Sequence, residues 1–273
     1  MLSVLNSEVE PWERLAKTDA LWAVISTDDL RAGALTQEAQ ARFWRSGEAH
    51  VDHVMSILRA EIDPTFHPRA SLDFGCGVGR NLVPLARQSS GALGLDISPT
   101  MVDKARERLG SLSIENATAQ VVGEGIEGLT PASFDFVHCV LVFQHIAPAH
   151  GLALLRQLLE LLEPGGKGFV QFYCHGKETA GVAHLRSLRF AHGRLNQLCV
   201  ATGIGKLKNM VMLHEYAIME VLDALHAGRV DKVVMERTGP SALAHHLRLY
   251  FSKAELGTTT VAGSLPLTLE LRT

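Results

Sequence analysis

The chain has 273 residues, a formal net charge of −3 and a sequence pI near 6.5. This length suits one large α/β domain with an appended element, and the charge argues against binding of nucleic acid or anionic membranes by bulk electrostatics. Because the sequence shows neither a basic leader nor a long apolar run, we expect a cytoplasmic protein that acts on small molecules. The 4 cysteines form no Cys-x-x-Cys pair, so reduced structural thiols are expected rather than disulfides or zinc.

The first part of the chain has helical periodicity. Apolar residues such as Val51, Val54 and Met55 recur with the i, i+3, i+4 spacing of one helix face. No strand-like alternation interrupts this part. We therefore predict a helical N-terminal cap over residues 1–66, followed by a core over residues 67–273.

From residue 70 onward, apolar strand patterns alternate with helical ones. Ser98 and Pro99 supply a typical N-cap and first-turn proline for one of these helices. Because helices separate the strands, right-handed crossovers and a parallel sheet are expected. Strands are predicted over residues 70–74, 92–96, 118–122, 134–142 and 168–173, with helices over 81–87, 98–109 and 152–162.

After Tyr173 the pattern becomes irregular but helix-prone, and a helical lid insertion is predicted over residues 174–215. Residues 174–213 of it carry six basic side chains and one acidic one, Glu178. Either these residues form a solvated helix face, or Arg186 and Arg189 meet a carboxylate or phosphate on the substrate. Beyond it, a helix is predicted over 217–226, strands over 230–235 and 247–251, and an edge strand in the tail from residue 258.

Residues 72–80 read Leu-Asp-Phe-Gly-Cys-Gly-Val-Gly-Arg. This pattern indicates an apolar strand that leads into a turn with glycine at alternate positions, where a ligand can lie against bare backbone N–H groups. Asp96 follows at the end of the next strand, the usual position for a carboxylate that binds two ribose hydroxyls. One nucleoside cofactor could therefore span both features.

Further motifs follow in order: Val122-Gly123-Glu124-Gly125, Ser133-Phe134-Asp135-Phe136-Val137, Phe143-Gln144-His145-Ile146 and Leu162-Glu163-Pro164-Gly165-Gly166. With the glycine turn and Asp96, they resemble the small-molecule branch of the class I S-adenosylmethionine-dependent methyltransferases, best over residues 68–173. The resemblance implies an α/β, Rossmann-like fold with a seven-stranded, mostly parallel sheet in the order 3-2-1-4-5-7-6. Its seventh strand would be antiparallel, and S-adenosylmethionine would be the cofactor.

The resemblance also assigns cofactor roles to matching positions. Asp73 and the glycine turn would hold the methionine end, with Arg80 capping the turn or meeting the carboxylate. Glu124 stands where the family usually has Asp at the adenine amino group, and this is a departure. Asp135 would anchor the loop before its strand. The implied cofactor-binding residues are Asp73, Gly75, Cys76, Gly77, Gly79, Arg80, Asp96, Ile97, Met101, Glu124, Gly125 and Val140.

Methyl transfer from a sulfonium is an in-line displacement, which needs an aligned acceptor and, for a hydroxyl or ammonium, a group that removes a proton. His145 follows strand four and titrates near working pH, so it either acts as this base or shapes the pocket wall. The other catalytic candidates are Tyr173, His175 and Tyr216. Trp44, like Tyr173, is a candidate for cation–π contact with the sulfonium.

These features predict metal-free methyl transfer to an oxygen or nitrogen of a small molecule, with no nucleic-acid or membrane partner. Cyclisation or aminopropyl transfer from the same cofactor, and binding without catalysis, stay open as alternatives. A nicotinamide-dependent dehydrogenase is disfavoured because its third glycine would fall where this chain has Arg80. The acceptor and the oligomeric state are not specified by the sequence.

Overall fold

A computed structural model of the protein describes residues 2–122, 126, 128–175, 213–238, 244–257 and 266–272, without the side chains of residues 2–8, 175, 244 and 245. Most of the predicted lid over residues 174–215 lies outside these ranges, as do Arg186 and Arg189. The division into a cap and a core therefore stays a prediction.

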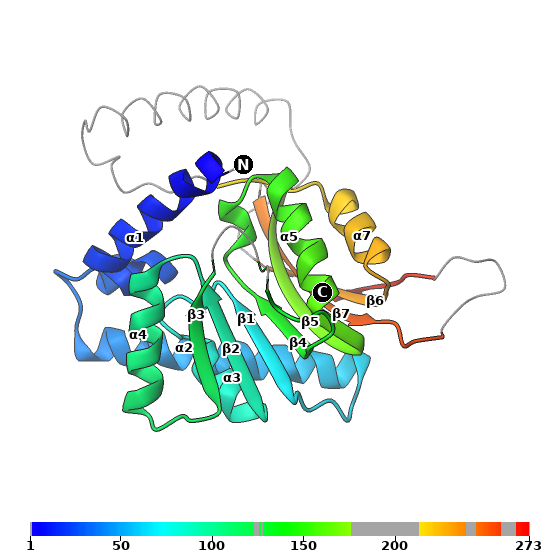
Figure 1. Ribbon diagram of the computed structural model, residues 1–273, viewed down its shortest axis with the longest axis horizontal. Coiled ribbons are helices and arrows are strands. Elements are labelled where there is room, and N and C mark those ends of the chain that lie inside the picture. The colour runs from blue at the N-terminus through cyan, green and yellow to red at the C-terminus, as the bar shows by residue number, and fades with distance from the viewer. Residues whose placement is uncertain are drawn as a thin grey trace.

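The described strands form one sheet in the order β3-β2-β1-β4-β5-β7-β6-β8 (Figure 1). The predicted order of seven strands is confirmed, and the tail adds β8 at the edge beside β6. The strands are β1 Ala70–Phe74, β2 Gly91–Asp96, β3 Ala117–Val121, β4 Phe134–Cys139, β5 Leu162–His175, β6 Val230–Thr238, β7 Ala244–Lys253 and β8 Thr268–Arg272.

Strand directions also follow the prediction. β1 is parallel to β2 and β4, β2 to β3, and β4 to β5, whereas β7 is antiparallel to both β5 and β6. The carboxyl ends of β1, β2 and β4 therefore meet at one edge, where doubly wound sheets bind their ligands.

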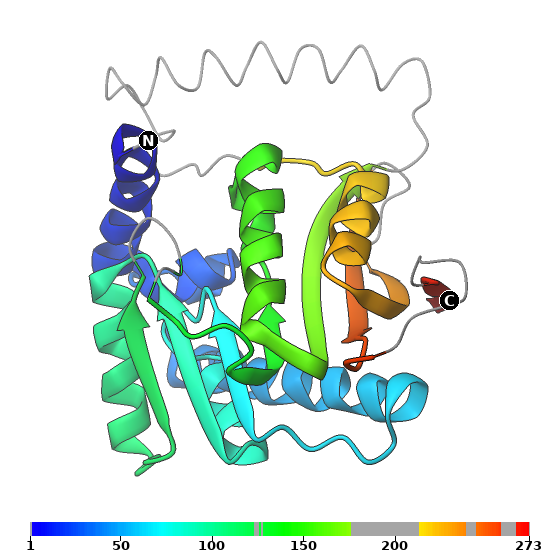
Figure 2. The same cartoon turned by 45° about the vertical axis from the view of Figure 1, so that its right-hand side comes forward.

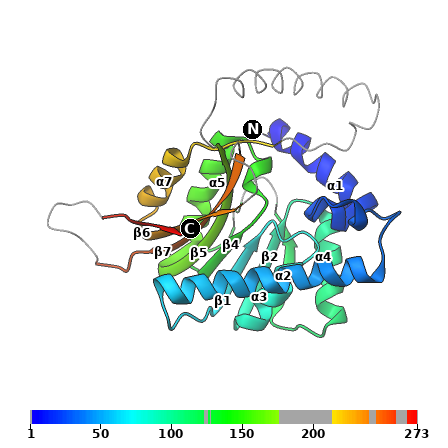
Figure 3. The ribbon, with the colours of Figure 1, turned by 180° about the vertical axis from the view of Figure 1, so that it is seen from behind.

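Helices cover both faces of the sheet. On one face, α2 packs Val51 and Met55 against Phe136 and Tyr250, and Figure 3, which shows this face, has α2 running across the front of the strands. On the other face, Leu155 of α5 joins a cluster that also includes residues of α7 (Figure 2). The helices are α1 Leu2–Val24, α2 Gln37–Ile57, α3 Leu82–Gln88, α4 Pro99–Ser111, α5 Pro148–Leu161 and α7 Ile218–Ala227, with short turns η1 Asp28–Leu30, η2 Leu58–Ile62 and η3 Phe143–His145.

Several element boundaries differ from the sequence prediction, and the ends of β4 and α5 bear most on the site. The fourth strand ends at Cys139 rather than at residue 142, because Leu141 has a φ of 61°, which no strand accommodates. The helix before β5 ends at Leu161, and Leu162 already pairs with Phe134. The Pro-Gly-Gly segment therefore lies within the irregular start of β5 instead of separating helix from strand.

Local signals place α4 as predicted. The Ser98 side chain accepts a hydrogen bond from the Met101 amide at 3.2 Å, and proline occupies the first turn. This cap starts the helix directly after β2, so the residues between them are held at the ligand edge of the sheet. The described cysteines, Cys76, Cys139 and Cys174, are free and buried.

Candidate functional site

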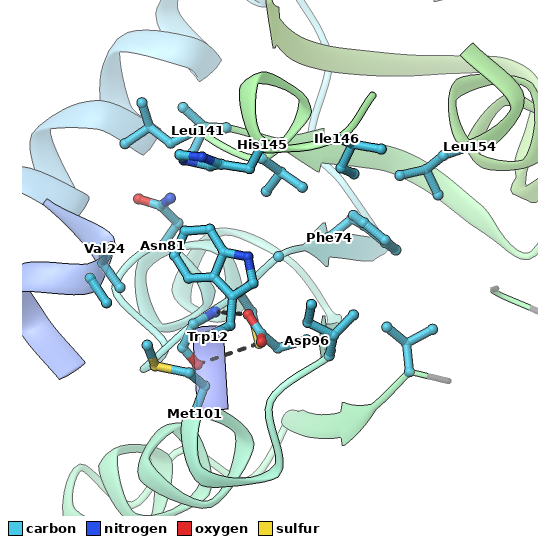
Figure 4. A pocket seen from close by; sticks show the side chains of 18 of the residues that line it. Trp12, Val24, Phe74, Asn81, Asp96, Met101, Leu141, His145, Ile146 and Leu154 are labelled. Atoms are coloured by element: carbon cyan, nitrogen blue, oxygen red, sulfur yellow. Dashed lines mark hydrogen bonds between the residues drawn. The ribbon is translucent and has the colours of Figure 1, made fainter. Parts of the chain in front are cut away.

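A cavity of 320 Å³ opens at the carboxyl ends of β1, β2 and β4 (Figure 4). It is formed by the glycine turn, the loop after β4, the first turns of α5 and one side of α1. Most of the residues that the sequence assigned to cofactor binding meet here. Those that line the cavity are Gly75, Cys76, Gly77, Arg80, Asp96, Ile97, Met101 and Val140, together with the catalytic candidate His145.

The glycine turn provides close approach rather than free donors. Gly75 has a φ of 75°, and an added Cβ would overlap Val142, so only glycine fits there. The Gly75 and Cys76 amides both donate to the Leu95 carbonyl, at 2.7 and 2.9 Å, and Gly79 donates to Cys76. The expectation of bare N–H groups at these positions is therefore wrong, because the turn uses them to bind itself to β2.

Gly79 has a different role from the one implied by the resemblance. It does not line the cavity, and a Cβ at this position would lie 3.4 Å from Ala105 on α4. The absence of a side chain therefore lets the turn pack closely against that helix.

Asp96 is held at the mouth of the turn. Its Oδ2 accepts from the Gly77 amide and its Oδ1 from the Ser98 amide, both at 2.9 Å. Burial raises the pKa of this carboxyl to about 6, although these amides lower it. Asp96 is thus rigidly placed at the end of β2, with the part that remains exposed facing the cavity.

Three buried polar atoms near the turn have no hydrogen-bond partner among the described residues: Asp73 Oδ2, Arg80 Nε and Asn81 Oδ1. Unpaired buried polar atoms are costly and call for an explanation. Burial lowers the pKa of the Arg80 guanidinium to about 10, although the nearby Asp73 acts to raise this pKa. Arg80 and Asn81 line the cavity, whereas Asp73, also predicted to bind the cofactor, is 1% exposed and is not among the residues that line it.

His145 and Trp12 both line the cavity. His145 ends η3, and its ring centroid lies 4.8 Å from that of Trp12, with the rings at 73° (Figure 4). The sequence analysis proposed Trp44 as the aromatic ring of the site. Trp44 instead lies against Phe43 and beneath the Arg108 guanidinium, away from the residues that line the cavity.

Glu13, the residue next to Trp12, binds α1 to the start of α4. Glu13 accepts hydrogen bonds from Ser98 Oγ and Thr100 Oγ1, both at 2.6 Å, and from the Thr100 amide at 3.2 Å. These groups belong to the first turn of α4. The carboxylate therefore binds the helix N-terminus, where negative charge is favoured, and holds Trp12 over the cavity.

One face of α5 contributes residues that sequence reasoning missed. His150, Ala153, Leu154 and Gln157 all line the cavity. Their i, i+3, i+4, i+7 spacing marks one helix face and could have identified them, but the prediction of this helix relied on the leucines of the opposite face. This part of the cavity wall therefore combines two polar side chains, His150 and Gln157, with Ala153 and Leu154.

The other candidates lie elsewhere. Tyr216 is 2% exposed and its hydroxyl donates to the Ile146 carbonyl at 2.8 Å, so it supports the loop before α5 from within the core. Tyr173 lies in β5 with its ring 5.3 Å from that of His246, outside the cavity lining. Glu124 and Gly125 lie outside the described residues, and His175 is described only by its backbone in β5.

Asp135 lies away from the cavity and has the anchoring contacts expected of it. Its carboxylate accepts from the amides of Arg69 and Ala70 at 2.8 to 3.0 Å, which joins β4 to the start of β1. Within the described ranges, no group of three potential metal ligands is found. None of the described helices is long and apolar enough to cross a membrane.

Comparison with known sequences agrees with the site. Residues 72–167 match the model of a family described as a methyltransferase domain. The ubiquinone biosynthesis O-methyltransferase of Methylococcus capsulatus is 28% identical over 152 residues, covering 53% of this chain and 63% of that protein. The chain thus spans less than two thirds of the length of this curated relative.

Comparison with solved structures shows the same fold. A magnesium protoporphyrin IX methyltransferase from Synechocystis PCC 6803, solved with S-adenosylmethionine bound, aligns with 93% of this chain and all of its own, at 17% identity and a TM-score of 0.57. A [4+2]-cyclase aligns with 74% of this chain and 81% of its own, at 14% identity and a TM-score of 0.53. The fold is therefore shared by proteins that catalyse different reactions.

Proposed function

We propose that this protein, whose residues 72–167 match a methyltransferase domain, transfers the methyl group of S-adenosylmethionine to a small, largely apolar acceptor. The cofactor, when bound, supplies an electrophilic methyl group on its sulfonium. The protein must hold the cofactor, admit the acceptor, exclude water and remove a proton where the acceptor is a hydroxyl or ammonium.

The observation that carries this proposal is the set of unpaired buried atoms around the glycine turn. Asp73 and Asn81 each present an unpaired oxygen, and Arg80 presents an unpaired N–H. Acceptors for an ammonium beside a donor for a carboxylate are the complement of an amino-acid zwitterion. The cofactor's methionine end has these two groups, so the residues fit it.

Asp96 supports the other end of the cofactor. It projects from the end of β2, where related folds bind ribose hydroxyls, and its two backbone hydrogen bonds fix its orientation. Ile97 and Met101 line the cavity next to it and would contact the adenine. Glu124 remains the proposed partner of the adenine amino group, and Gly125 remains a proposed cofactor-binding residue beside it.

The acceptor is proposed to have an apolar body with one reactive hydroxyl or amine. Leu141, Ile146 and Leu154 supply apolar walls, and His145 and His150 supply polar groups among them. We propose that His145 receives or orients the acceptor's proton, because a neutral imidazole titrates near neutral pH. An anionic group on the acceptor would have to meet Arg186 and Arg189.

The first test is cofactor binding by calorimetry. S-adenosylmethionine and S-adenosylhomocysteine should both bind to the purified protein. Asp96→Asn should weaken binding at least about tenfold, the loss expected for hydrogen bonds to a charged group. Asp103→Asn is the matched control, since this exposed carboxylate on α4 pairs only with Arg106 among the described residues. Equal affinities of the two variants would contradict the proposed ribose contact.

The second test is product analysis over an acceptor panel of phenols, apolar amines and their phosphorylated or carboxylated forms. Methyl transfer leaves S-adenosylhomocysteine, whereas displacement at the amino-acid chain leaves methylthioadenosine, which would favour the alternative chemistry. Binding without turnover on any acceptor would favour a non-catalytic role. His145→Ala should lower turnover without changing cofactor affinity, and His226→Ala, on the exposed end of α7, should change neither.

A further inference from the structure

Three polar side chains cross the interior from β1 to α2. Asp73 Oδ1 lies 2.8 Å from His138 Nδ1, and His138 Nε2 lies 2.9 Å from His50 Nε2. The three residues come from β1, β4 and α2, and Asp73 and His138 are 1% and 0% exposed. The sequence separates them widely, and only the sheet order brings them together.

Their surroundings make this arrangement unusual. The His138 ring stacks on Phe169 with a centroid distance of 5.2 Å and an interplanar angle of 16°, and His50 also contacts Phe169 edge-on. A carboxylate and two imidazoles among aromatic rings cost free energy unless each is hydrogen-bonded. Since an apolar residue would pack here without that cost, the hydrogen bonds of His138 need a reason beyond packing.

The distances constrain the protons. An ionised Asp73 accepts only, so His138 Nδ1 must carry a hydrogen. Of the two facing Nε2 atoms, one must donate and the other accept. Burial, together with the neighbouring His138, keeps the pKa of His50 far below its ordinary value, so the His50 imidazole is neutral.

These hydrogen bonds involve only one oxygen of Asp73 and leave the other, Oδ2, for a ligand. Oδ1 is fixed by His138, and Oδ2 is buried without a partner among the described residues. The nearby Asp73 also acts to raise the pKa of Arg80, a residue that lines the cavity. The carboxylate is thus held in one orientation, with its second oxygen unpaired beside the glycine turn.

We propose that His138 and His50 are positioning residues that orient the Asp73 carboxylate toward the ammonium group of the bound cofactor. This inference rests on the proposed function, because it needs a ligand with an ammonium at that place. Neither histidine touches the reacting atoms. They act through Asp73, His138 by its direct hydrogen bond and His50 by fixing the proton positions of His138.

The test compares two ligands by calorimetry. S-adenosylhomocysteine carries the ammonium, whereas methylthioadenosine lacks the amino-acid end and shares the nucleoside. His138→Phe should weaken S-adenosylhomocysteine binding about tenfold to hundredfold, the range for loss of a hydrogen bond to a charged group, and leave methylthioadenosine within about twofold. His50→Phe should show the same selectivity with a smaller loss. His53→Phe, one helical turn later and bonded to Glu236 at 3.1 Å, should change neither affinity.

Two further variants separate positioning from general destabilisation. His138→Asn keeps a donor near the place of Nδ1 and should recover most of the affinity for S-adenosylhomocysteine, and it serves as the readout if His138→Phe does not fold. In an Asp73→Asn background, His138→Phe should have no further effect on S-adenosylhomocysteine binding. Equal losses for both ligands, no loss for either, or an undiminished loss in the Asp73→Asn background would overturn the inference.

Failure of the proposed function has a different signature. In that case the unaltered protein would bind neither S-adenosylhomocysteine nor methylthioadenosine. If the unaltered protein binds both and His138→Phe and His138→Asn leave the two affinities unchanged, the cofactor assignment stands and the role of the histidines is refuted.

Discussion

Replacing Glu13 by Gln tests how α1 is held over the cavity. The Glu13 carboxylate accepts three hydrogen bonds from Ser98 and Thr100 at the start of α4. Burial raises the pKa of this carboxyl, but the hydrogen bonds from Ser98 and Thr100 outweigh burial and lower the pKa to about 2. Glutamine keeps one acceptor oxygen and loses the charge, so it cannot satisfy all three donors.

The size of the effect follows from the pKa. A decrease from 4.5 to about 2 corresponds to roughly 3 kcal/mol of differential interaction with the ionised form. The Glu13 side chain is 20% exposed, and solvent screening reduces this to about 2 kcal/mol. Because the folded-state pKa lies below the unfolded value, the stabilisation is fully present above pH 4.5 and is lost as the pH falls toward 2.

The assay is urea unfolding at pH 7, followed by circular dichroism and by tryptophan emission in a Trp22→Phe, Trp44→Phe background. Glu13→Gln should lose about 2 kcal/mol, or, if α1 detaches before the rest, shift the Trp12 emission at low urea. Glu10→Gln, one turn earlier, removes a carboxylate that is 81% exposed and 3.7 Å from Arg14. A Glu13→Gln variant that matches Glu10→Gln in both signals would refute the reasoning.

Three further outcomes are expected. Since burial raises the pKa of Asp96 to about 6, cofactor affinity measured by calorimetry should fall about tenfold between pH 7 and pH 5, whereas the unliganded protein should lose stability as the pH rises through the interval from 3.8 to 6; a flat affinity profile would contradict this. Asp135→Asn should reduce the free energy of unfolding by about 1 to 3 kcal/mol through its bonds to Arg69, with cofactor affinity unchanged. Gly75→Ala, at a φ of 75° and with Val142 in the way, should lower both stability and cofactor affinity, whereas Gly33→Ala, with no atom within 4 Å of the added Cβ, should lower neither.

Much of the fold could be predicted because its signals are local. Apolar periodicity identified the helices, and Ser98 with Pro99 marked the start of α4. The resemblance supplied the strand order, which the structure confirms. Exact ends were less predictable where the backbone departs from regular conformations, as at Leu141, since single residues of positive φ leave no periodic signal.

The residues of the site were predicted only in part, because tertiary contacts rather than a local pattern bring some of them to the cavity. Asp96 and the glycine turn are specified by their position at strand ends, and both border the cavity. Trp44 was the tryptophan predicted for the site, but Trp12 is the one that lines the cavity; both lie in helices before the core, and nothing in the local pattern says which indole faces the strand ends. The hydrogen bonds that Glu13 accepts at the start of α4 hold the adjacent Trp12 over the cavity.

The sequence by itself therefore determined the alternation of strands and helices, the glycine turn and the acid at the end of β2, since each depends on neighbouring residues. Only the tertiary structure decided that the turn's amides are already bonded, that Tyr216 is a core residue, and that Asp73, His138 and His50 are in contact. The physical reason is range. Backbone propensity acts over a few residues, whereas a hydrogen bond between β1, β4 and α2 exists only after the sheet has assembled and a helix has packed across it.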